Sequence, residues 1–164
     1  MQNAKDTFYV MLQGRLAALN PSRMIVVRGL LRPGIVVEEN ELSTAATPID
    51  AFRLQWTGMR IDSAGPLPLI AMECAIHYAT DGSPDGGGMD RGRLLAAMDA
   101  ELASALGVEP RTVSKMSYTE AGSVAMGTNV FWAGLVFGAA TAVDQRLERT
   151  ATVQVFAYEE AGER

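Results

Sequence analysis

The chain has very few of the side chains on which metal binding and covalent catalysis usually depend. Its 164 residues include one cysteine, Cys74, and one histidine, His77. A single cysteine excludes an internal disulfide and a cysteine-based zinc site, and it fits a protein of a reducing compartment. Cys74 and His77 are three positions apart on one expected strand, so their side chains point to opposite faces. We therefore expect Cys74 to be a core residue and not a nucleophile activated by His77.

Long apolar runs and an excess of positive charge are also absent. Residues 121–143 carry no charge, but their continuous apolar part, residues 130–143, is shorter than the roughly 20 residues that cross a bilayer as a helix. The N-terminal segment has no charged leader followed by an apolar stretch, so we expect no signal peptide and no membrane partner. A formal charge of -5 argues against a general positive field, so we expect no direct, sequence-specific nucleic-acid binding.

The sequence also contains no recognisable cofactor-binding motif. The glycine-rich loop at residues 81–88 precedes an expected helix, yet it has neither the lysine of a phosphate-binding loop nor a G-x-G-x-x-G pattern. Its acidic residues lack the spacing of a calcium-binding loop. Glu73 shares a face with His77, but one histidine beside one carboxylate is a small ligand set, so a polar surface or interface position is the preferred interpretation. We expect no cofactor, no metal site and no catalytic site.

The hydrophobic pattern predicts a single α+β domain over residues 1–164. Helical spacing of apolar residues indicates two helices, and apolar–polar alternation indicates several strands. The expected helices cover residues 5–20 and 90–106, and the expected strands cover residues 24–30, 35–39, 52–57, 69–80, 130–144 and 147–159. Turns are expected at residues 32–34 and near Asp144, a small-residue loop at 43–48, and irregular structure at 108–129. We expect a mostly antiparallel sheet with both helices packed on one face.

The last strand but one is expected to be apolar on both faces. Simple alternation puts Phe131, Leu135 and Phe137 on one side, and Trp132 and Val136 on the other. Two helices of about four turns can cover only one face of a sheet, so the second apolar face needs a partner. For a chain of one kind, the simplest partner is another copy.

These considerations lead to a set of candidate subunit-interface residues on the faces and turns that the helices leave uncovered. The set comprises Arg53, Glu73, His77, Trp132, Val136, Arg146, Glu148 and Arg149. For the cluster of Arg146, Glu148 and Arg149, two interpretations stay open: a solvated turn, or a salt-bridging edge between subunits. Arginine supplies twelve of the fourteen basic residues, and its guanidinium suits subunit contacts because it binds carboxylates with two hydrogen bonds.

The order of elements resembles that of the tail terminator (tail completion) proteins of long-tailed phages and contractile injection particles. The resemblance rests on residues 7–19, 69–80, 90–106 and 150–160. It implies a ring, usually six-membered, that caps the finished tail tube and offers a surface to the head-side connector. It also implies no catalysis. The chain departs from the family pattern in being longer, through residues 108–129 and 130–143.

The resemblance and the missing catalytic residues lead to one functional expectation. We expect a non-enzymatic, homo-oligomeric subunit of a six-membered ring, whose further partners are a tail tube or sheath protein and a head-side connector protein. Its expected location is the virion tail or a phage-like particle, assembled in the host cytoplasm. Two alternatives stay open: another connector, neck or tube component, and a small α+β enzyme or ligand-binding domain that uses Arg53, Glu73 and His77.

Overall fold

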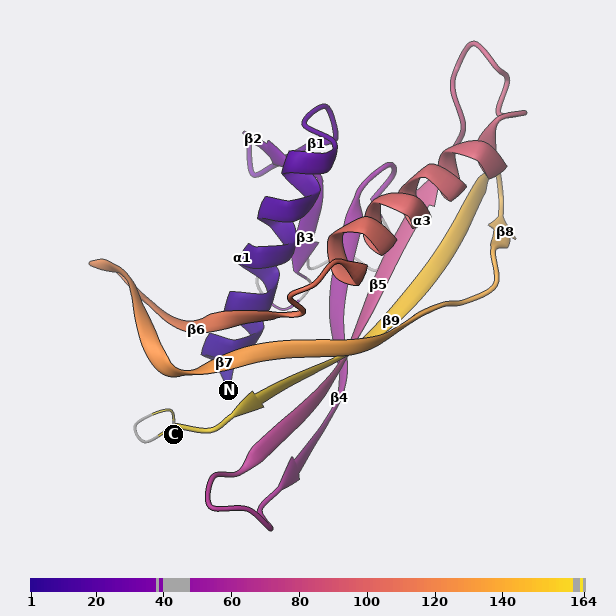
Figure 1. Cartoon of the computed structure of the whole chain (residues 1–164). Coiled ribbons are helices and arrows are strands. Elements are labelled where there is room, and N and C mark those ends of the chain that lie inside the picture. Colours follow the sequence, from indigo (N-terminus) through magenta and orange to yellow (C-terminus); the bar gives the residue numbers. More distant parts are fainter. Residues whose placement is uncertain (38, 40–47, 161–162, 164) are drawn as a thin grey trace.

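The computed structural model describes residues 1–37, 39, 48–160 and 163, and the statements below concern those residues. The elements follow in the order α1 (Gln2–Leu19), β1 (Met24–Val27), β2 (Leu30–Pro33), β3 (Ile35–Val37), β4 (Phe52–Asp62), β5 (Leu69–Thr80), α3 (Arg91–Gly107), β6 (Thr112–Thr119), β7 (Gly122–Phe137), β8 (Thr141–Val143) and β9 (Arg146–Tyr158). The fold is α+β and mostly antiparallel, as the sequence predicts (Figure 1). The loop expected at 43–48 lies outside the described residues, except for Pro48.

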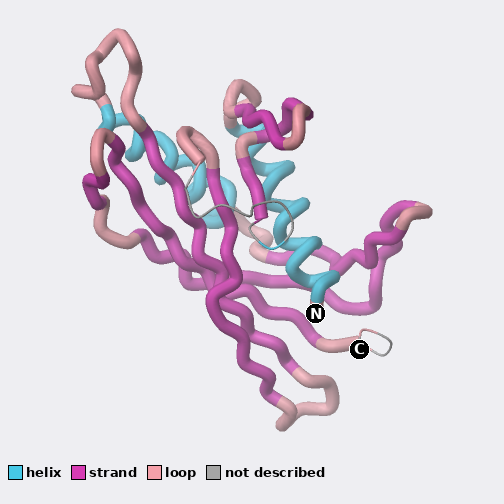
Figure 2. The backbone as a smooth tube through the Cα atoms, turned by 180° about the vertical axis from the view of Figure 1, so that it is seen from behind, coloured by secondary structure: helices cyan, strands magenta, loops and turns pink. Residues whose placement is uncertain are grey.

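One twisted sheet forms the body of the molecule (Figures 1 and 2). Its strands lie in the order β3-β4-β5-β9-β7-β6, and β8 pairs with the start of β9. β3 runs parallel to β4, whereas the other neighbouring strands in this sheet are antiparallel. The expected hairpin around Asp144 is present between β8 and β9. β1 and β2 form a separate two-stranded hairpin.

The hydrophobic core contains residues from both helices and from alternate positions of the central strands. Side chains on a strand alternate between its faces, so every second residue of β5 enters this core. These β5 residues, each at most 1% exposed, are Ile70, Met72, Cys74, Ile76 and Tyr78. The helix residues of the same cluster recur every three or four positions, which marks one stripe of a helix. They include Phe8, Leu12 and Leu16 of α1, and Leu95, Met98 and Leu102 of α3.

α1 is also tied to the edge strand β6 through a buried hydroxyl. The Thr7 hydroxyl donates to the carbonyl oxygen of Asn3 at 2.6 Å and accepts the backbone N–H of Met116 at 2.9 Å. This bond satisfies a backbone group that an edge strand would otherwise leave open. The helix ends at Asn20, whose backbone N–H donates to the carbonyl oxygen of Leu16 at 2.9 Å.

Three of the expected elements are wrong. The strand expected at 130–144 is interrupted after Phe137, so β8 is a separate strand. The turn expected at residues 32–34 lies instead at Arg28 and Gly29, where φ is 51° and 80°. Positive φ at both positions is what a two-residue type I′ hairpin requires, so the strand expected at 24–30 divides into β1 and β2. Residues 108–129, expected to be irregular, contain β6 and the first part of β7. Their side chains are largely polar, so hydrophobic alternation gave no signal there.

A β-bulge changes which face the side chains of β7 occupy. At Gly134, where φ is +68°, β7 has one residue more than the stretch of β9 that it faces. Simple alternation predicted Trp132 and Val136 on one face and Leu135 on the other. Instead, Trp132 is 3% exposed and Leu135 packs against the same core, while Val136 is 60% exposed. The predicted faces are therefore wrong beyond Gly134, because the extra residue reverses the alternation.

Candidate subunit interface

The face of β5 opposite the core carries polar side chains that join neighbouring strands. His77 Nε2 lies 3.0 Å from Gln55 Oε1 on β4, and His77 Nδ1 lies 2.9 Å from Thr150 Oγ1 on β9. Cross-strand pairs of this kind stabilise a sheet. Both ring nitrogens are therefore within hydrogen-bond distance of partners in the same subunit, and His77 would have to lose one of these bonds to bind a metal ion.

Glu73 forms a second bridge across the same three strands. Its Oε1 accepts a hydrogen bond from Thr57 Oγ1 at 2.8 Å, and its Oε2 accepts one from Gln154 Nε2 at 3.1 Å. Glu73 and His77 therefore share a face, as the alternation predicts. We call the residues of the two bridges the polar band, which comprises Gln55, Thr57, Glu73, His77, Thr150 and Gln154.

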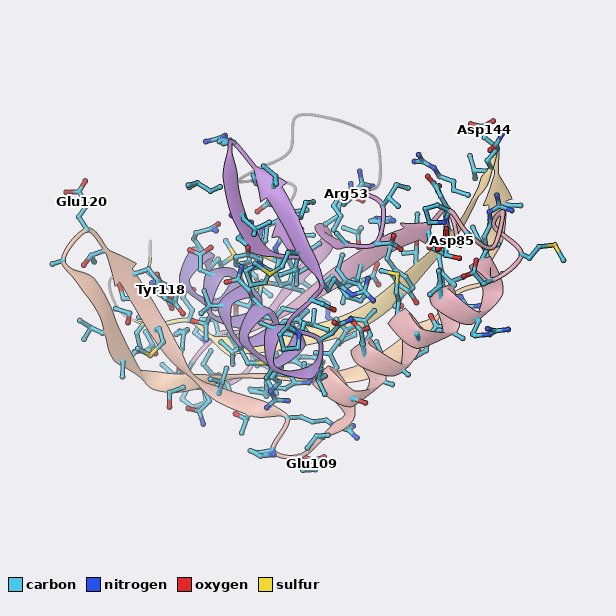
Figure 3. The ribbon with its side chains drawn as sticks, turned by 90° about the horizontal axis from the view of Figure 1, so that it is seen from above. Arg53, Asp85, Glu109, Tyr118, Glu120 and Asp144 are labelled. Carbon is cyan, nitrogen blue, oxygen red and sulfur yellow. The ribbon has the colours of Figure 1, made fainter. Side chains whose placement is uncertain are left out.

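Arg53 lies beside the polar band and is buried. It sits on β4 directly opposite His77, so the two side chains share a face of the sheet. Figure 3 shows its position near the middle of the molecule. The structure thus brings Arg53, Glu73 and His77 to one face, as expected. Arg53 is only 8% exposed, however, which leaves little of it for contact with another molecule.

The cluster of Arg146, Glu148 and Arg149 divides between two parts of the subunit. Arg149 forms an ion pair with Asp99 of α3. Arg146 lies 3.6 Å from Asp81 in the loop before α3, and 3.9 Å from Glu148. These ion pairs are made within the subunit, while the side chains of Arg146 and Glu148 stay 32% and 29% exposed.

The two β7 candidates have opposite environments. Trp132 packs edge-to-face against Phe8 with 5.9 Å between ring centroids, and its indole N–H donates to the carbonyl oxygen of Leu106 at 3.0 Å. The guanidinium of Arg15 lies 5.0 Å from the Trp132 ring. Trp132 therefore belongs to the core of its own subunit, whereas Val136 is exposed to other molecules.

Three hairpins project from the sheet (Figure 2), and each carries exposed apolar side chains. These are the β1–β2, β4–β5 and β6–β7 hairpins. Their exposed apolar residues are Met24, Val26, Leu30 and Leu31 on the first, Met59, Ile61 and Leu67 on the second, and Tyr118 and Val124 on the third. Each hairpin therefore offers apolar surface away from the core.

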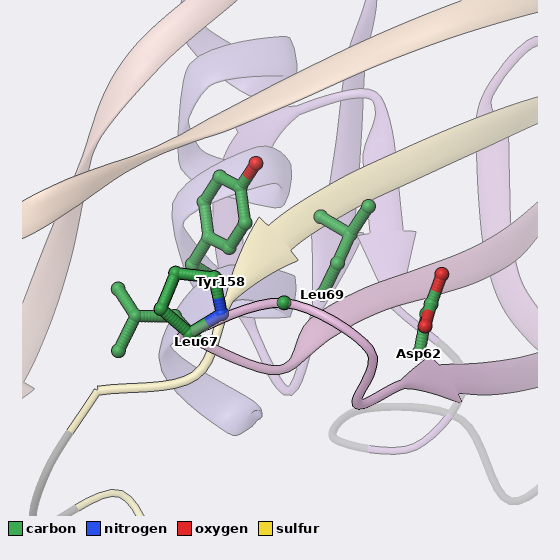
Figure 4. Close-up of a pocket in the computed structure, with 6 residues that line it drawn as sticks. Asp62, Leu67, Leu69 and Tyr158 are labelled. Atoms are coloured by element: carbon green, nitrogen blue, oxygen red, sulfur yellow. The ribbon is translucent and has the colours of Figure 1, made fainter.

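The end of the β4–β5 hairpin also contains a shallow pocket of about 340 Å³. Asp62, Leu67 and Tyr158 are among its lining residues (Figure 4). The Phe131 ring stacks on Phe156 with centroids 5.5 Å apart, and it lies 6.3 Å from the Tyr158 ring. These aromatic residues share a face with the polar band, so this side of the sheet is polar at its centre and apolar towards the hairpin end.

Burial changes the ionisation of two core side chains of β5, Cys74 and Tyr78. Burial raises the pKa of the Cys74 thiol, which keeps it protonated and unreactive. Burial, and then the hydrogen bond to Asp99, raise the pKa of Tyr78. Among the described residues, no group of three or more His, Cys, Asp or Glu side chains is placed to hold a metal ion. In the same part of the chain, neither helix has the length and apolar character needed to cross a membrane.

Sequence reasoning missed one buried charged cluster, where β6 meets the C-terminal segment. Lys115 is fully buried, and its Nζ donates to the carbonyl oxygen of Tyr158 at 2.6 Å and to Glu163 at 2.7 Å. Its Nζ also lies 3.3 Å from Glu160. A hydrogen bond from Thr128 and others from Gly127 and Lys115 lower the pKa of Glu160 to about 2. The only sequence signal was that lysine is rare in this chain, which does not say where Lys115 lies.

No protein-family model matches this chain, and no curated protein matches it. What the protein does must therefore be inferred from its own residues and their geometry. Those residues combine a polar band with apolar hairpins, and both features are typical of surfaces that meet other proteins.

Proposed function

We propose that this protein is a ring-forming structural subunit of a phage-type tail, acting as a tail terminator that caps the tail tube and joins it to the head-side connector. The observation that carries the proposal is the distribution of exposed apolar side chains over three hairpins on different sides of the molecule. A ring subunit contacts two neighbours through two different surfaces and meets further proteins above and below the ring. It therefore needs several separate apolar surfaces, which is what these hairpins offer.

We also infer that both helices cover the same face of the sheet. In support, buried residues of α1 and α3 belong to one core cluster with Ile70, Met72 and Ile76 of β5. Neither α1 nor α3 then covers the opposite face. Its polar band and its aromatic residues resemble the mixture of polar and aromatic side chains found at protein interfaces.

The mass of the oligomer and its position on the tail test this proposal. The subunit mass is 17.5 kDa, so light scattering behind a sizing column should give six times that mass for the assembled ring. Labelling with an antibody should mark one end of each tail in electron micrographs. Labelling that repeats along the tube would instead identify a tube component. A monomer found both in the purified protein and in the assembled particle would contradict the proposal.

A further inference from the structure

The β1–β2 hairpin carries apolar residues on both of its faces and projects from the sheet (Figure 1). Val26 and Leu31 pair directly across the two strands and are 64% and 67% exposed. Met24 shares their face, and Leu30 is exposed on the other face. Contiguous exposed apolar surface marks an interaction site, and a two-stranded hairpin on its own is only marginally stable in water. The hairpin therefore has the properties of an element that binds another protein.

The base of this hairpin is held firmly by its own subunit. The Arg32 guanidinium donates to Tyr9 Oη at 2.9 Å and to the carbonyl oxygen of Ile35 at 3.2 Å. The backbone N–H of Gly34 donates to the carbonyl oxygen of Arg23 at 2.8 Å. A projecting element that is already ordered loses little conformational entropy when it binds, so its apolar surface contributes more fully to affinity.

The hairpin segment is positively charged as well as apolar. Residues 21–37 contain three arginines and no acidic residue, although Arg23 at the base is paired with Glu101. Arg28 forms the exposed turn of the hairpin with Gly29, and it has no ion-pair partner in the described part of the chain. The tip therefore combines a free guanidinium with neighbouring apolar side chains.

The loop before α3 and the β8–β9 hairpin together have the complementary charge. We call residues 81–90 and 141–150 the acidic corner, because they contain five acidic residues and two arginines. Figure 3 shows Asp85 and Asp144 at the same end of the molecule, and the ion pair of Arg146 with Asp81 joins the two segments. Neither of these two carboxylates has an ion-pair partner within the described ranges. The corner thus has an excess of negative charge available to a basic partner.

A groove of about 480 Å³ opens at the acidic corner. Gly138, Ala139 and Val143 give its wall an apolar part, and Glu148 adds a carboxylate. Arg149 also lines the groove, where its charge is balanced by the ion pair with Asp99. Interfaces commonly combine an apolar centre with complementary charges at the rim, which select the partner and speed association. The groove and the charges around it therefore match the apolar strands and the arginine of the β1–β2 hairpin.

We propose that the β1–β2 hairpin of one copy binds in the groove at the acidic corner of the next copy. This deepens the ring function proposed above and rests on it. In Figure 1 the hairpin lies to the left of α3, whereas β8 lies to the right of α3. A contact between two different surfaces on opposite sides of a subunit is head-to-tail, and its repetition gives a ring when the rotation closes and an open filament when it does not. Use of the same surface by both copies would give a two-fold dimer instead.

Engineered cysteine pairs test this contact directly, because the native Cys74 is buried and contributes little background. A chain with Val26→Cys and Ala139→Cys should form, on mild oxidation of the oligomer, a ladder of covalent species that ends at the ring size. The control chain carries Val124→Cys and Ala139→Cys; Val124 is 65% exposed on a different hairpin and should give no ladder. An oligomer in which the first pair gives no ladder, or in which both pairs react equally, overturns the contact.

Charge exchange provides a second test. Arg28→Glu and Asp144→Arg should each weaken subunit association about tenfold at low salt, and the doubly exchanged chain should recover it. Glu120→Arg, on the tip of the β6–β7 hairpin (Figure 3), is the control and should leave association unchanged. A ring that forms equally well in both single variants, or is not recovered in the double variant, overturns this inference and leaves the ring function standing. A wild-type chain that is monomeric in solution and in particles overturns the ring function itself.

Discussion

Two buried regions of the subunit are stabilised in different ways. In the core that contains the helices, Phe8 is fully buried and packs edge-to-face against Trp132 at 5.9 Å. Where β6 meets the C-terminal segment, Lys115 is equally buried, but its neighbours are the carboxylates of Glu160 and Glu163. The first region is stabilised by apolar area removed from water, which has no preferred direction. The second depends on a few oriented charges, each of which is costly to bury alone.

Because the two regions are stabilised differently, they differ in their sensitivity to pH and to mutation. Apolar packing is insensitive to pH but sensitive to lost volume, because a cavity forfeits contacts on every side. The ionic region is less sensitive to lost volume, but it is destabilised when one of its charges is removed or neutralised, because the opposite charge then stays buried without compensation. Mutations and pH should therefore affect the two regions in opposite patterns.

Truncation of the aromatic centre should have the largest effect. Phe8→Ala removes a fully buried ring that contacts both Trp56 and Trp132, so we expect a loss of about 3 to 5 kcal/mol in the free energy of unfolding. Urea denaturation followed by circular dichroism measures it. The control is Val10→Ala on the same helix, 44% exposed, which should change stability by less than about 0.5 kcal/mol. Equal losses in the two variants would contradict the assignment of Phe8 to the core.

Removal of the buried cation should have the next largest effect. Lys115→Ala removes the ion pair of Glu163, whose side chain is 3% exposed, and leaves it the N-terminal ammonium at 3.6 Å, so we expect a loss of about 3 kcal/mol in the free energy of unfolding. The additional change Glu163→Gln should restore part of that loss, because it removes a buried charge that has lost its nearest cation. As a control, Arg111→Ala breaks an ion pair with Glu109 between exposed side chains and should cost less than about 1 kcal/mol. If Glu163→Gln lowers the free energy of unfolding of the Lys115→Ala variant still further, the buried charges do not stabilise this region.

Acid should separate the two regions without any mutation. The folded pKa of Glu160, about 2, lies below its ordinary value of 4.5, so the folded protein binds this proton less readily than the unfolded chain. The stabilisation is therefore fully present above pH 4.5 and is lost as the pH falls towards 2. Denaturation curves at successive pH values should show this slope in the wild type and a smaller one in Glu160→Gln. An unchanged slope in that variant would rule out Glu160 as its source.

The apolar region was predictable from the sequence, and the ionic region was not. β5 was predicted with its observed bounds because its two faces differ strongly: Ile70, Met72 and Ile76 alternate with polar or small residues. The burial of Lys115 depends on Glu163, which lies 48 positions further along the chain. Local periodicity contains no information about such a pairing, and the polar strand β6 carries too little hydrophobic contrast to be recognised.

For the candidate interface, the sequence predicted which residues of β5 share a face but not their partners on neighbouring strands. The alternation correctly assigns Glu73 and His77 to one face of β5. Their partners on β4 and β9 follow from strand register, which depends on non-local pairing. The bulge at Gly134 is a further non-local feature: its extra residue places Val136 on the face opposite to that of Trp132, with which simple alternation had grouped it.

The polar band belongs to neither buried region, so its disruption should have the smallest effect on stability. His77→Ala removes two hydrogen bonds, to Gln55 and Thr150, at a half-buried position, and we expect a loss of about 1 kcal/mol. Because the band links strands on the side of the sheet opposite the core cluster, we expect the same variant to weaken association of subunits while circular dichroism stays unchanged. Glu73→Gln is the matched control, since an amide keeps the size of the side chain and one acceptor for Thr57. A stability loss in His77→Ala as large as that in Phe8→Ala would mean that the face is a second core and not a surface for a neighbouring copy.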